Sequence, residues 1–333
     1  MQLISVVVPV YNESEVIDVF HKRAKAALGA LEGLDHEIVY VDDGSSDDSY
    51  QKLSRLASGD PRVRVIRFSR NFGHQIAITA GIDHARGDAV VAIDADLQDP
   101  PEVIRDMVNK WRDGFDVVYG VREQRDGETM LKLVTASAFY RLLGTVAKIH
   151  IPPDVGDFRL MSRRATDEFK SLREKDRFVR GLVTWIGFRQ TGVRYHRDAR
   201  YAGETKYPYS KMIKFALDGI TSFSSLPLKL ASWLGYLTSL LAFLYLASVF
   251  VQKALGYTVQ GWATIMVALL FLGGVQLICL GLLGEYIGRI FDEVKRRPMY
   301  VIEEILETTS ENQCPDTSQP VSADSSAVPY LRG

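Results

Sequence analysis

The sequence predicts an α/β protein with a mainly parallel sheet, followed by two transmembrane helices. Between residues 3 and 120, short apolar runs alternate with amphipathic segments. This alternation is typical of parallel strands joined by right-handed crossovers. Beyond residue 229, two stretches without any charged residue are each longer than the roughly 20 residues that a helix needs to cross a bilayer. At 333 residues, the chain is long enough for both parts.

Five apolar runs predict the strands, and a segment with helical spacing follows each of the first four. The expected strands are Leu3–Val10, Glu37–Val41, Val63–Phe68, Ala89–Ile93 and Asp116–Gly120. The expected helices are Glu15–Leu31, Asp47–Ala57, Gln75–Ala85 and Glu102–Trp111. Because the carboxyl ends of parallel strands share one edge of a sheet, we expect a ligand site at that edge.

Two carboxylates, Asp94 and Asp96, follow the apolar run that ends at Ile93. Side chains alternate along extended backbone, so both carboxylates would point the same way at the rim of the sheet. With the carbonyl of Gln98 they offer the hard oxygen ligands that Mg²⁺ and Mn²⁺ prefer. The alternative is an acidic turn before Pro100, and both interpretations stay open on this motif alone.

A second acid pair, Asp42 and Asp43, ends the second expected strand, next to the end of the first. A turn with a helix cap would explain Gly44 and Ser46, but it leaves the acid pair unexplained. The first strand is followed by neither a GxGxxG motif nor a Walker lysine. A dinucleotide dehydrogenase and a P-loop NTPase are therefore disfavoured.

Three motifs at strand ends, Val8–Glu13, Val41–Ser45 and Asp94–Asp96, resemble those of the inverting family 2 glycosyltransferases, which have the GT-A fold. The resemblance is more specifically to the polyprenyl-phosphate glycosyltransferases, because of three further stretches, residues 96–101, 156–160 and 203–207. That group includes dolichol-phosphate mannose synthases and bacterial undecaprenyl-phosphate glucosyltransferases. The two C-terminal spans are more similar to the bacterial branch. The resemblance covers about residues 3 to 300.

The resemblance implies a nucleotide-sugar donor, with UDP-glucose favoured, and a divalent cation, Mg²⁺ or Mn²⁺. The residues it would place around the nucleotide sugar are Pro9, Tyr11, Glu13, Asp42, Asp43, Asp94 and Ala95. Those it would place on the cation are Asp94, Asp96 and Gln98. The implied acceptor is undecaprenyl or dolichyl phosphate, and the candidate phosphate-binding residues are Arg122, Arg125, Arg200 and Lys206.

A lipid phosphate acceptor changes what catalysis requires. The second pKa of a phosphate monoester is near ~6, so the acceptor is already a nucleophilic dianion at neutral pH. The harder problem is to bring two anions together, which calls for positive groups on both. Asp157, implied as catalytic together with Asp96, would orient the phosphate through Arg159 or accept a residual proton. Its alternative is a structural Asp–Arg pair in a loop. In-line attack would give a β-linked product.

Basic residues flank the two spans unevenly. Lys229 precedes them, three basic residues from Lys295 to Arg297 follow them, and only Lys253 lies between. The positive-inside rule then predicts a multi-pass protein of the inner (plasma) membrane with its catalytic domain and both termini in the cytoplasm. Nothing at the start of the chain has the pattern of a cleaved signal peptide. The alternative, two buried helices of a soluble domain, is disfavoured by the length of the uncharged runs.

The expected organisation follows from these boundaries. It comprises a cytosolic GT-A catalytic domain (1–209), an interfacial amphipathic helix (210–229), two transmembrane helices (230–251 and 262–284), a cytosolic segment (285–307) and a disordered tail (308–333). Residues 135–149, like the interfacial helix, mix apolar and basic side chains in a manner that suits a membrane surface, although packing on the sheet is the alternative.

Several classes of function are disfavoured. The net charge of −1 argues against a nucleic-acid partner, and the two cysteines form neither a disulfide framework nor a zinc site. A processive polysaccharide synthase would carry a Gln-x-x-Arg-Trp helix, and no tryptophan here follows an arginine. A non-catalytic membrane adaptor would have lost the acid motifs, which are present. Two spans alone make a small bundle, so the sequence is compatible with a homo-oligomer and does not fix the number of subunits.

Overall fold

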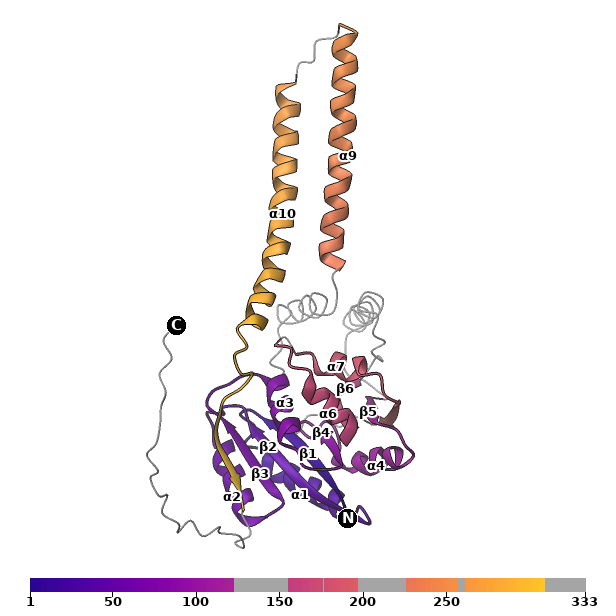
Figure 1. Cartoon of the computed structure of the whole chain (residues 1–333). Coiled ribbons are helices and arrows are strands. Elements are labelled where there is room, and N and C mark those ends of the chain that lie inside the picture. Colours follow the sequence, from indigo (N-terminus) through magenta and orange to yellow (C-terminus); the bar gives the residue numbers. More distant parts are fainter. Residues whose placement is uncertain (123–154, 176, 197–225, 257–260, 309–333) are drawn as a thin grey trace, which may run out of the picture.

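The structure is a computed structural model that describes residues 1–122, 155–175, 177–196, 226–256 and 261–308. Within these residues one sheet has the strand order β7-β5-β6-β4-β1-β2-β3-β8 (Figure 1). The strands are β1 Gln2–Val10, β2 Leu34–Asp42, β3 Val63–Phe68, β4 Ala89–Ala92, β5 Val117–Arg122, β6 Val155–Ser162, β7 Gln190–Tyr195 and β8 Ile302–Glu307. The predicted α/β class is confirmed.

Most strand pairs are parallel, as expected. β1 lies at the centre between β2 and β4, and β5 pairs in parallel with β7. Two strands run the other way: β6 lies antiparallel between β4 and β5, and β8 lies antiparallel on β3. Neither of these two was foreseen. The second strand also begins earlier than predicted, at Leu34, because it pairs with β1 from Gln2 onward.

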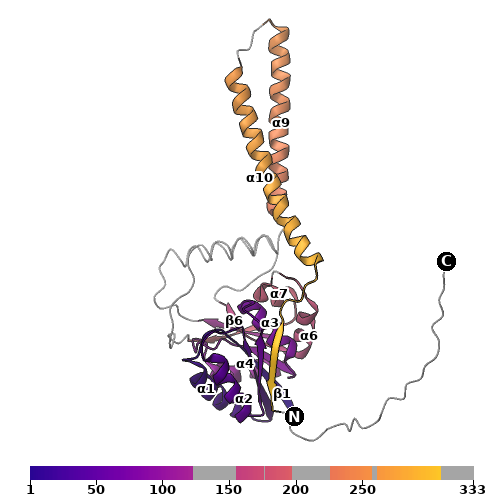
Figure 2. The same cartoon turned by 90° about the vertical axis from the view of Figure 1, so that its left-hand side faces the viewer.

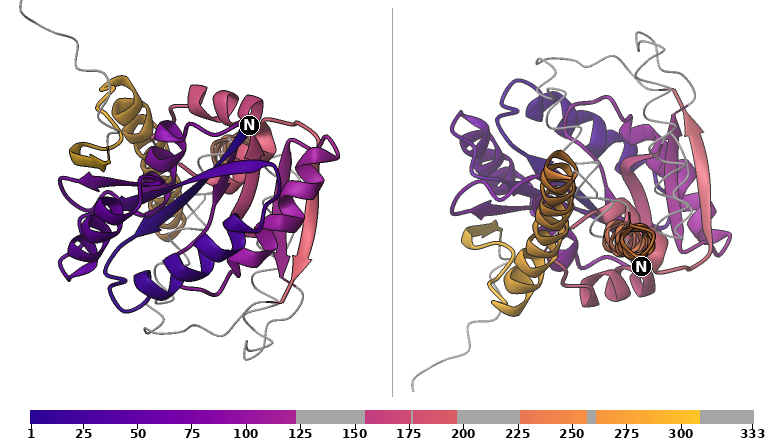
Figure 3. Two further views of the ribbon diagram at one scale, coloured as in Figure 1. Left: turned by 90° about the horizontal axis from the view of Figure 1, so that it is seen from below. Right: turned by 90° about the horizontal axis from the view of Figure 1, so that it is seen from above.

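Helices cover both faces of the sheet (Figure 3). Successive side chains along each strand enter the core layers on the two faces in turn. In one core layer, Val6 and Val8 of β1 pack against three helices: α1 Ile17–Gly29, α2 Ser49–Gly59 and α4 Ile104–Arg112. The 3₁₀ turn η1 Pro101–Val103 precedes α4. In the other layer, Val7 packs against α3 His74–His84, α6 Arg163–Ser171 and α7 Val179–Trp185.

Two long helices, α9 Leu226–Ala254 and α10 Trp262–Val294, project away from the sheet domain in both side views (Figures 1 and 2). Their apolar side chains, among them Leu237, Phe250 and Leu277, are exposed on the outside of the pair. Each helix is long and apolar enough to cross a membrane, and only 6% and 0% of their most apolar stretches are buried. A core helix of a soluble protein would be covered, so this is a membrane-associated protein.

The expected spans 230–251 and 262–284 lie within these helices, but both helices are longer than predicted. The first begins at Leu226, inside the range expected for an interfacial helix. The rest of that range, with residues 135–149 and most of the tail, lies outside the described residues. After α10 the chain returns to the sheet as β8, where the Tyr300 ring stacks on Phe68 with centroids 5.3 Å apart. The Tyr300 hydroxyl donates to Asp83 at 2.9 Å.

Candidate active site

The predicted site residues that the structure describes gather at the carboxyl edge of the sheet. Pro9 is buried near the end of β1, and Tyr11 and Glu13 follow in the next loop. Asp42 is the last residue of β2, and the acid loop with Asp94, Ala95, Asp96 and Gln98 follows β4. Arg125, Arg200 and Lys206 lie outside the described residues. Because β1 pairs in parallel with β2 and β4, the loops that follow these three strands lie together at one edge of the sheet.

The loop after β1 is held against the loop after β2. The backbone N–H of Asn12 donates to Ser45 Oγ at 3.0 Å, and the Asn12 side chain accepts the N–H of Ser46 at 2.8 Å. Asn12 has a left-handed backbone with φ of 54°, a conformation that asparagine tolerates better than most residues. The adjacent Tyr11 side chain is left 44% exposed. It offers a flat aromatic surface beside the acid pair.

The two acids after β2 have different environments. The Asp43 carboxylate accepts the backbone N–H groups of Phe72 at 2.7 Å and Gly73 at 2.9 Å, and so fixes the turn into α3. Asp42 is fully buried. Its Oδ1 accepts the N–H of Ser45 at 3.3 Å, whereas Oδ2 has no hydrogen-bond partner among the described residues. Burial raises the pKa of both carboxyls. Asp43 shapes the site, and Asp42 has an acceptor atom to offer.

Strand pairing sets Asp157 opposite the acid loop. β6 pairs antiparallel with β4, and Ala92 faces Arg159, so two residues further along Asp94 meets Asp157. His74, the first residue of α3, lies between them: its Nε2 is 3.5 Å from Asp94 Oδ1 and 3.5 Å from Asp157 Oδ2. Burial opposes protonation of His74, but the two carboxylates outweigh it and raise its pKa to about 9. The two carboxylates therefore favour the protonated form of His74.

The Asp157 carboxylate is buried and accepts hydrogen bonds at both oxygens. Arg180 Nε donates to Oδ1 at 2.9 Å and Arg180 Nη2 to Oδ2 at 3.1 Å, which is a bidentate pair. Gln75 Nε2 donates to Oδ2 at 3.1 Å, while its Oε1 accepts the backbone N–H of Val179 at 3.0 Å. Burial alone would raise the pKa of Asp157, but Arg180 and His74 hold it well below the usual range.

Asp157 lies in strand β6, whereas the alternative of a structural pair had placed it in a loop. Arg159 Nη2 lies 4.0 Å from the Asp157 carboxylate and donates to the carbonyl of Gly156 at 2.8 Å. Arg180 is the closer cationic partner of Asp157, and sequence reasoning did not identify it.

The acid loop has a strained backbone. Leu97, between Asp96 and Gln98, has φ of 60°, a left-handed conformation that a leucine rarely adopts. The N–H of Gln98 donates to Asp96 Oδ1 at 3.1 Å. Burial raises the pKa of Asp94 to about 6, with the neighbouring carboxylates adding to the shift and His74 opposing it. In the part of the chain that the structure describes, no three His, Cys, Asp or Glu residues form a metal cluster.

Comparison with known proteins adds to this geometry. Residues 5–169 match the Glycosyl transferase family 2 profile, and residues 226–290 match the GtrB C-terminal hairpin. The chain is 54% identical over 300 residues to the uncharacterized glycosyltransferase YkcC of Bacillus subtilis, covering 90% of this chain and 93% of that protein. The chain belongs to the family 2 glycosyltransferases.

Other relatives of this family 2 glycosyltransferase carry more specific names. A prophage bactoprenol glucosyl transferase homolog of Escherichia coli is 42% identical, covering 91% of this chain and 99% of that one. The bactoprenol glucosyl transferase of Shigella phage SfII is 44% identical, covering 90% and 97%. Among solved structures, glucosyl-3-phosphoglycerate synthase of Mycobacterium tuberculosis has a TM-score of 0.46 and 22% identity, covering 67% of this chain and 79% of that one.

Three residues of the glycosyltransferase site were missed from sequence: His74, Gln75 and Arg180. His74 and Gln75 begin α3 and are followed by a mostly apolar stretch from Ile76 to Ile82, so two adjacent polar residues there were the available signal. Arg180 gave no signal, because α7 is short and its neighbour in space, Asp157, is 23 positions away in the sequence.

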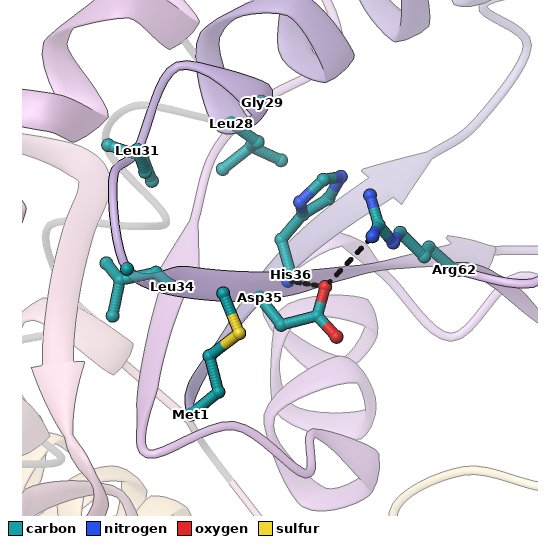
Figure 4. A pocket seen from close by; sticks show the side chains of 9 residues that line it. Met1, Leu28, Gly29, Leu31, Leu34, Asp35, His36 and Arg62 are labelled. Carbon is teal, nitrogen blue, oxygen red and sulfur yellow. Dashed lines mark hydrogen bonds and ion pairs between the residues drawn. The ribbon is translucent and has the colours of Figure 1, made fainter.

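A cavity elsewhere in the glycosyltransferase lies far from this chemistry (Figure 4). It opens at the amino-terminal ends of β1 and β2, opposite the edge that carries the acids. Figure 4 shows the Asp35–Arg62 ion pair, 3.3 Å long, at its rim. The cavity is lined by Met1, Leu28, Gly29, Leu31, Gly33, Leu34, Asp35, His36 and Arg62. Its mixed lining brings together no acid–base or metal-binding set, so the carboxyl edge remains the candidate active site.

Proposed function

We propose that this protein transfers glucose from UDP-glucose to the phosphate of undecaprenyl phosphate. The observation that carries the proposal is that one chain joins the acidic edge of a family 2 domain to two membrane-spanning helices. The same chain matches relatives named bactoprenol glucosyl transferase over nearly their whole length. The donor is water-soluble and the acceptor is a lipid, so an enzyme that joins them must have both parts.

The donor side fits a uridine nucleotide. Tyr11 offers an exposed ring against which a uracil can stack. The Asp42 Oδ2 atom accepts no hydrogen bond from the described residues and lies 3.9 Å from Arg67 Nε, so it can accept a ribose hydroxyl. Asp43 contributes indirectly, because both of its oxygens already hold the turn at Phe72 and Gly73.

A divalent cation would sit at the acid loop. Asp94 and Asp96 supply hard carboxylate oxygens, and Gln98 a carbonyl, which is the ligand set that Mg²⁺ or Mn²⁺ prefers. Asp94 and Asp96 are followed by Asp99 in the same loop, and a cation would balance the charge of these neighbouring carboxylates. Few protein ligands are needed, since the diphosphate of the donor and water complete the shell. When bound, the cation stabilises the charge that develops on the departing diphosphate.

The protein's own residues then act on the acceptor side. The phosphate dianion needs no base, and Asp157 is poorly suited to be one, since both oxygens accept hydrogen bonds and its pKa is far below neutrality. Its role is to hold Arg180 and His74 in place as fixed positive charges near the reacting anions. A phosphate oxygen forms the bond to the anomeric carbon as the bond to the diphosphate breaks, which inverts the centre.

The membrane helices place this chemistry at the bilayer. The basic run Lys295, Arg296 and Arg297 follows α10 directly, which supports a cytoplasmic location for the adjoining sheet domain. Glu293, on the last turn of α10, accepts the backbone N–H of Lys175 at 2.7 Å, so the end of the helix contacts the segment that leads into α7. Both the donor-binding edge and the membrane anchor therefore belong to one connected unit.

The test is glucose transfer by the detergent-purified protein. We expect undecaprenyl phosphate, UDP-glucose and Mg²⁺ to give a lipid one hexose heavier by mass spectrometry. The Asp96→Ala variant should give none while keeping its thermal midpoint. Absence of product from folded wild-type protein, across a panel of nucleotide sugars, would refute the proposal and favour a non-catalytic adaptor. A ladder of added hexoses would favour a processive synthase.

A further inference from the structure

Three polar residues meet beside the candidate active site in an arrangement that the proposed reaction has not yet used. Asp99 lies at the end of the acid loop, one residue beyond Gln98. Arg122 is the last residue of β5 and Tyr195 the last residue of β7, and the parallel register makes these two direct neighbours. The three side chains therefore come from segments far apart in the sequence to one point at the carboxyl edge.

The contacts form a closed ring. The Tyr195 hydroxyl donates to Asp99 Oδ1, and Arg122 Nε donates to the same hydroxyl at 3.2 Å. Arg122 Nη2 lies 3.5 Å from Asp99 Oδ2. A phenol has one proton to donate and lone pairs to accept, so these two bonds suit it. Asp99 is only 1% exposed, and a carboxylate that is so buried is stable only when it is paired in this way.

Two glycines make room for this ring next to Asp157. A Cβ on Gly156, the residue before Asp157, would lie 2.6 Å from Arg122 Nη2. A Cβ on Gly120 would lie 2.7 Å from the Tyr195 ring, which also packs edge-on against Phe158 with centroids 5.7 Å apart. The Arg122 guanidinium therefore rests on the backbone that carries Asp157. An arginine that extends into solvent would not require a glycine at this position.

Holding this guanidinium in place has a consequence for binding. An arginine that is free in water loses side-chain entropy when it binds a phosphate, whereas one that is already fixed loses little. A guanidinium carries five N–H donors in a rigid fork; in this ring Nε donates a hydrogen bond to Tyr195, and Nη2 forms the ion pair with Asp99. Asp99 also joins the acid loop of the donor side to the arginine on the acceptor side.

We propose that Asp99 and Tyr195 are positioning residues that set the Arg122 guanidinium for the phosphate of the lipid acceptor. This inference rests on the proposed function, since it concerns the second substrate of the same reaction. Neither residue touches the reacting atoms. Both act through Arg122, so their loss should weaken acceptor binding and leave donor binding unchanged.

The test is the split between the two KM values. Tyr195→Phe keeps the ring on Phe158 and removes only the hydroxyl, so this variant is expected to fold. We expect the KM for undecaprenyl phosphate to rise about tenfold, the loss expected for one charge-assisted hydrogen bond, and the KM for UDP-glucose to stay within about twofold. Asp99→Asn should move the same constant in the same direction.

Two further variants separate positioning from general destabilisation. Asp116→Asn removes an aspartate that is also buried and ion-paired, to Arg164, but at the other end of β5. It should leave both KM values unchanged. In an Arg122→Gln background, adding Tyr195→Phe should change the acceptor KM by less than about twofold, because the hydroxyl then has no guanidinium to position.

Each outcome decides the inference. An unchanged acceptor KM in Tyr195→Phe, an equal rise in both KM values, or an undiminished effect in the Arg122→Gln background would overturn it. The failure of the proposed function would look different, because wild-type protein itself would then transfer no glucose. Transfer by the wild type with no KM split in the variants would refute the positioning role alone.

Discussion

Asp157→Asn is the substitution for which the structure gives the clearest expectation. The wild-type carboxylate accepts two hydrogen bonds from Arg180 and one from Gln75, and its side chain is 7% exposed. An amide keeps one acceptor oxygen, adds N–H donors that face the donors of Gln75 and His74, and removes the charge that balances Arg180. Breaking a buried pair from one side costs about 3–5 kcal/mol.

Solvent reduces that figure here. The Arg180 side chain is 24% exposed, so water can take up part of the lost interaction, and we expect a loss of about 2–3 kcal/mol in the free energy of unfolding. For a domain of this size, that corresponds to a thermal midpoint lower by roughly 5–10 °C. The rate of glucose transfer should fall at least about 100-fold, because Arg180 and His74 lose the anchor that fixes their charges.

The assay combines thermal unfolding of the detergent-purified variant with initial rates of glucose transfer. Gln75→Leu is the milder comparison, since it removes one hydrogen bond to Asp157 and the one that Gln75 accepts from the Val179 N–H, and it leaves the Arg180 ion pair intact. Its midpoint should fall less than that of Asp157→Asn. An Asp157→Asn protein with the wild-type midpoint would refute the reasoning, because the carboxylate would then not be holding these groups. Recovery of the variant's rate at higher pH would point instead to a base.

Two other predictions concern donor binding and pH. Tyr11→Ala should raise the KM for UDP-glucose about tenfold, since base–aromatic stacking contributes about 1–3 kcal/mol, while the acceptor KM stays constant; an unchanged donor KM would remove Tyr11 from the site. Hydrogen bonds from Arg164 and then Ser162 lower the pKa of Asp116, so its contribution to stability is present above about pH 4 and is lost as the pH falls through the lowered pKa. The difference in thermal midpoint between wild type and Asp116→Asn should therefore shrink towards pH 3, and a constant difference would contradict this assignment.

The sequence predicted the parts of the fold that depend on local pattern. The five strands from β1 to β5 are rich in apolar residues, and each is present within a few residues of its expected bounds. The acids at the end of β2 and those in the acid loop after β4 were found for the same reason, because a carboxylate that follows a buried apolar run is easy to recognise. Parallel pairing alone then brought those loops to one edge.

The missed features depend on contacts between distant segments. β8 is a run of charged and apolar residues that becomes a strand only because the open edge of β3 supplies its hydrogen bonds. The partnership of Arg180 with Asp157 arises from the way α7 packs over β6, which no spacing in the sequence reveals. Asp157 and Arg159 are two positions apart in β6 and so point to the same face, and Arg159 Nη2 lies 4.0 Å from the Asp157 carboxylate. The shorter, bidentate pair with Arg180 was the contact that the sequence did not indicate.

The chemical structure of the product tests the central claim most directly. Lipid made by the purified protein from UDP-glucose and undecaprenyl phosphate would be examined by proton and phosphorus NMR, and the released nucleotide identified at the same time. A direct in-line attack by the lipid phosphate predicts glucose in β linkage to a single phosphate, with UDP released in equal amount. A diphosphate bridge with release of UMP, or an α linkage, would contradict it.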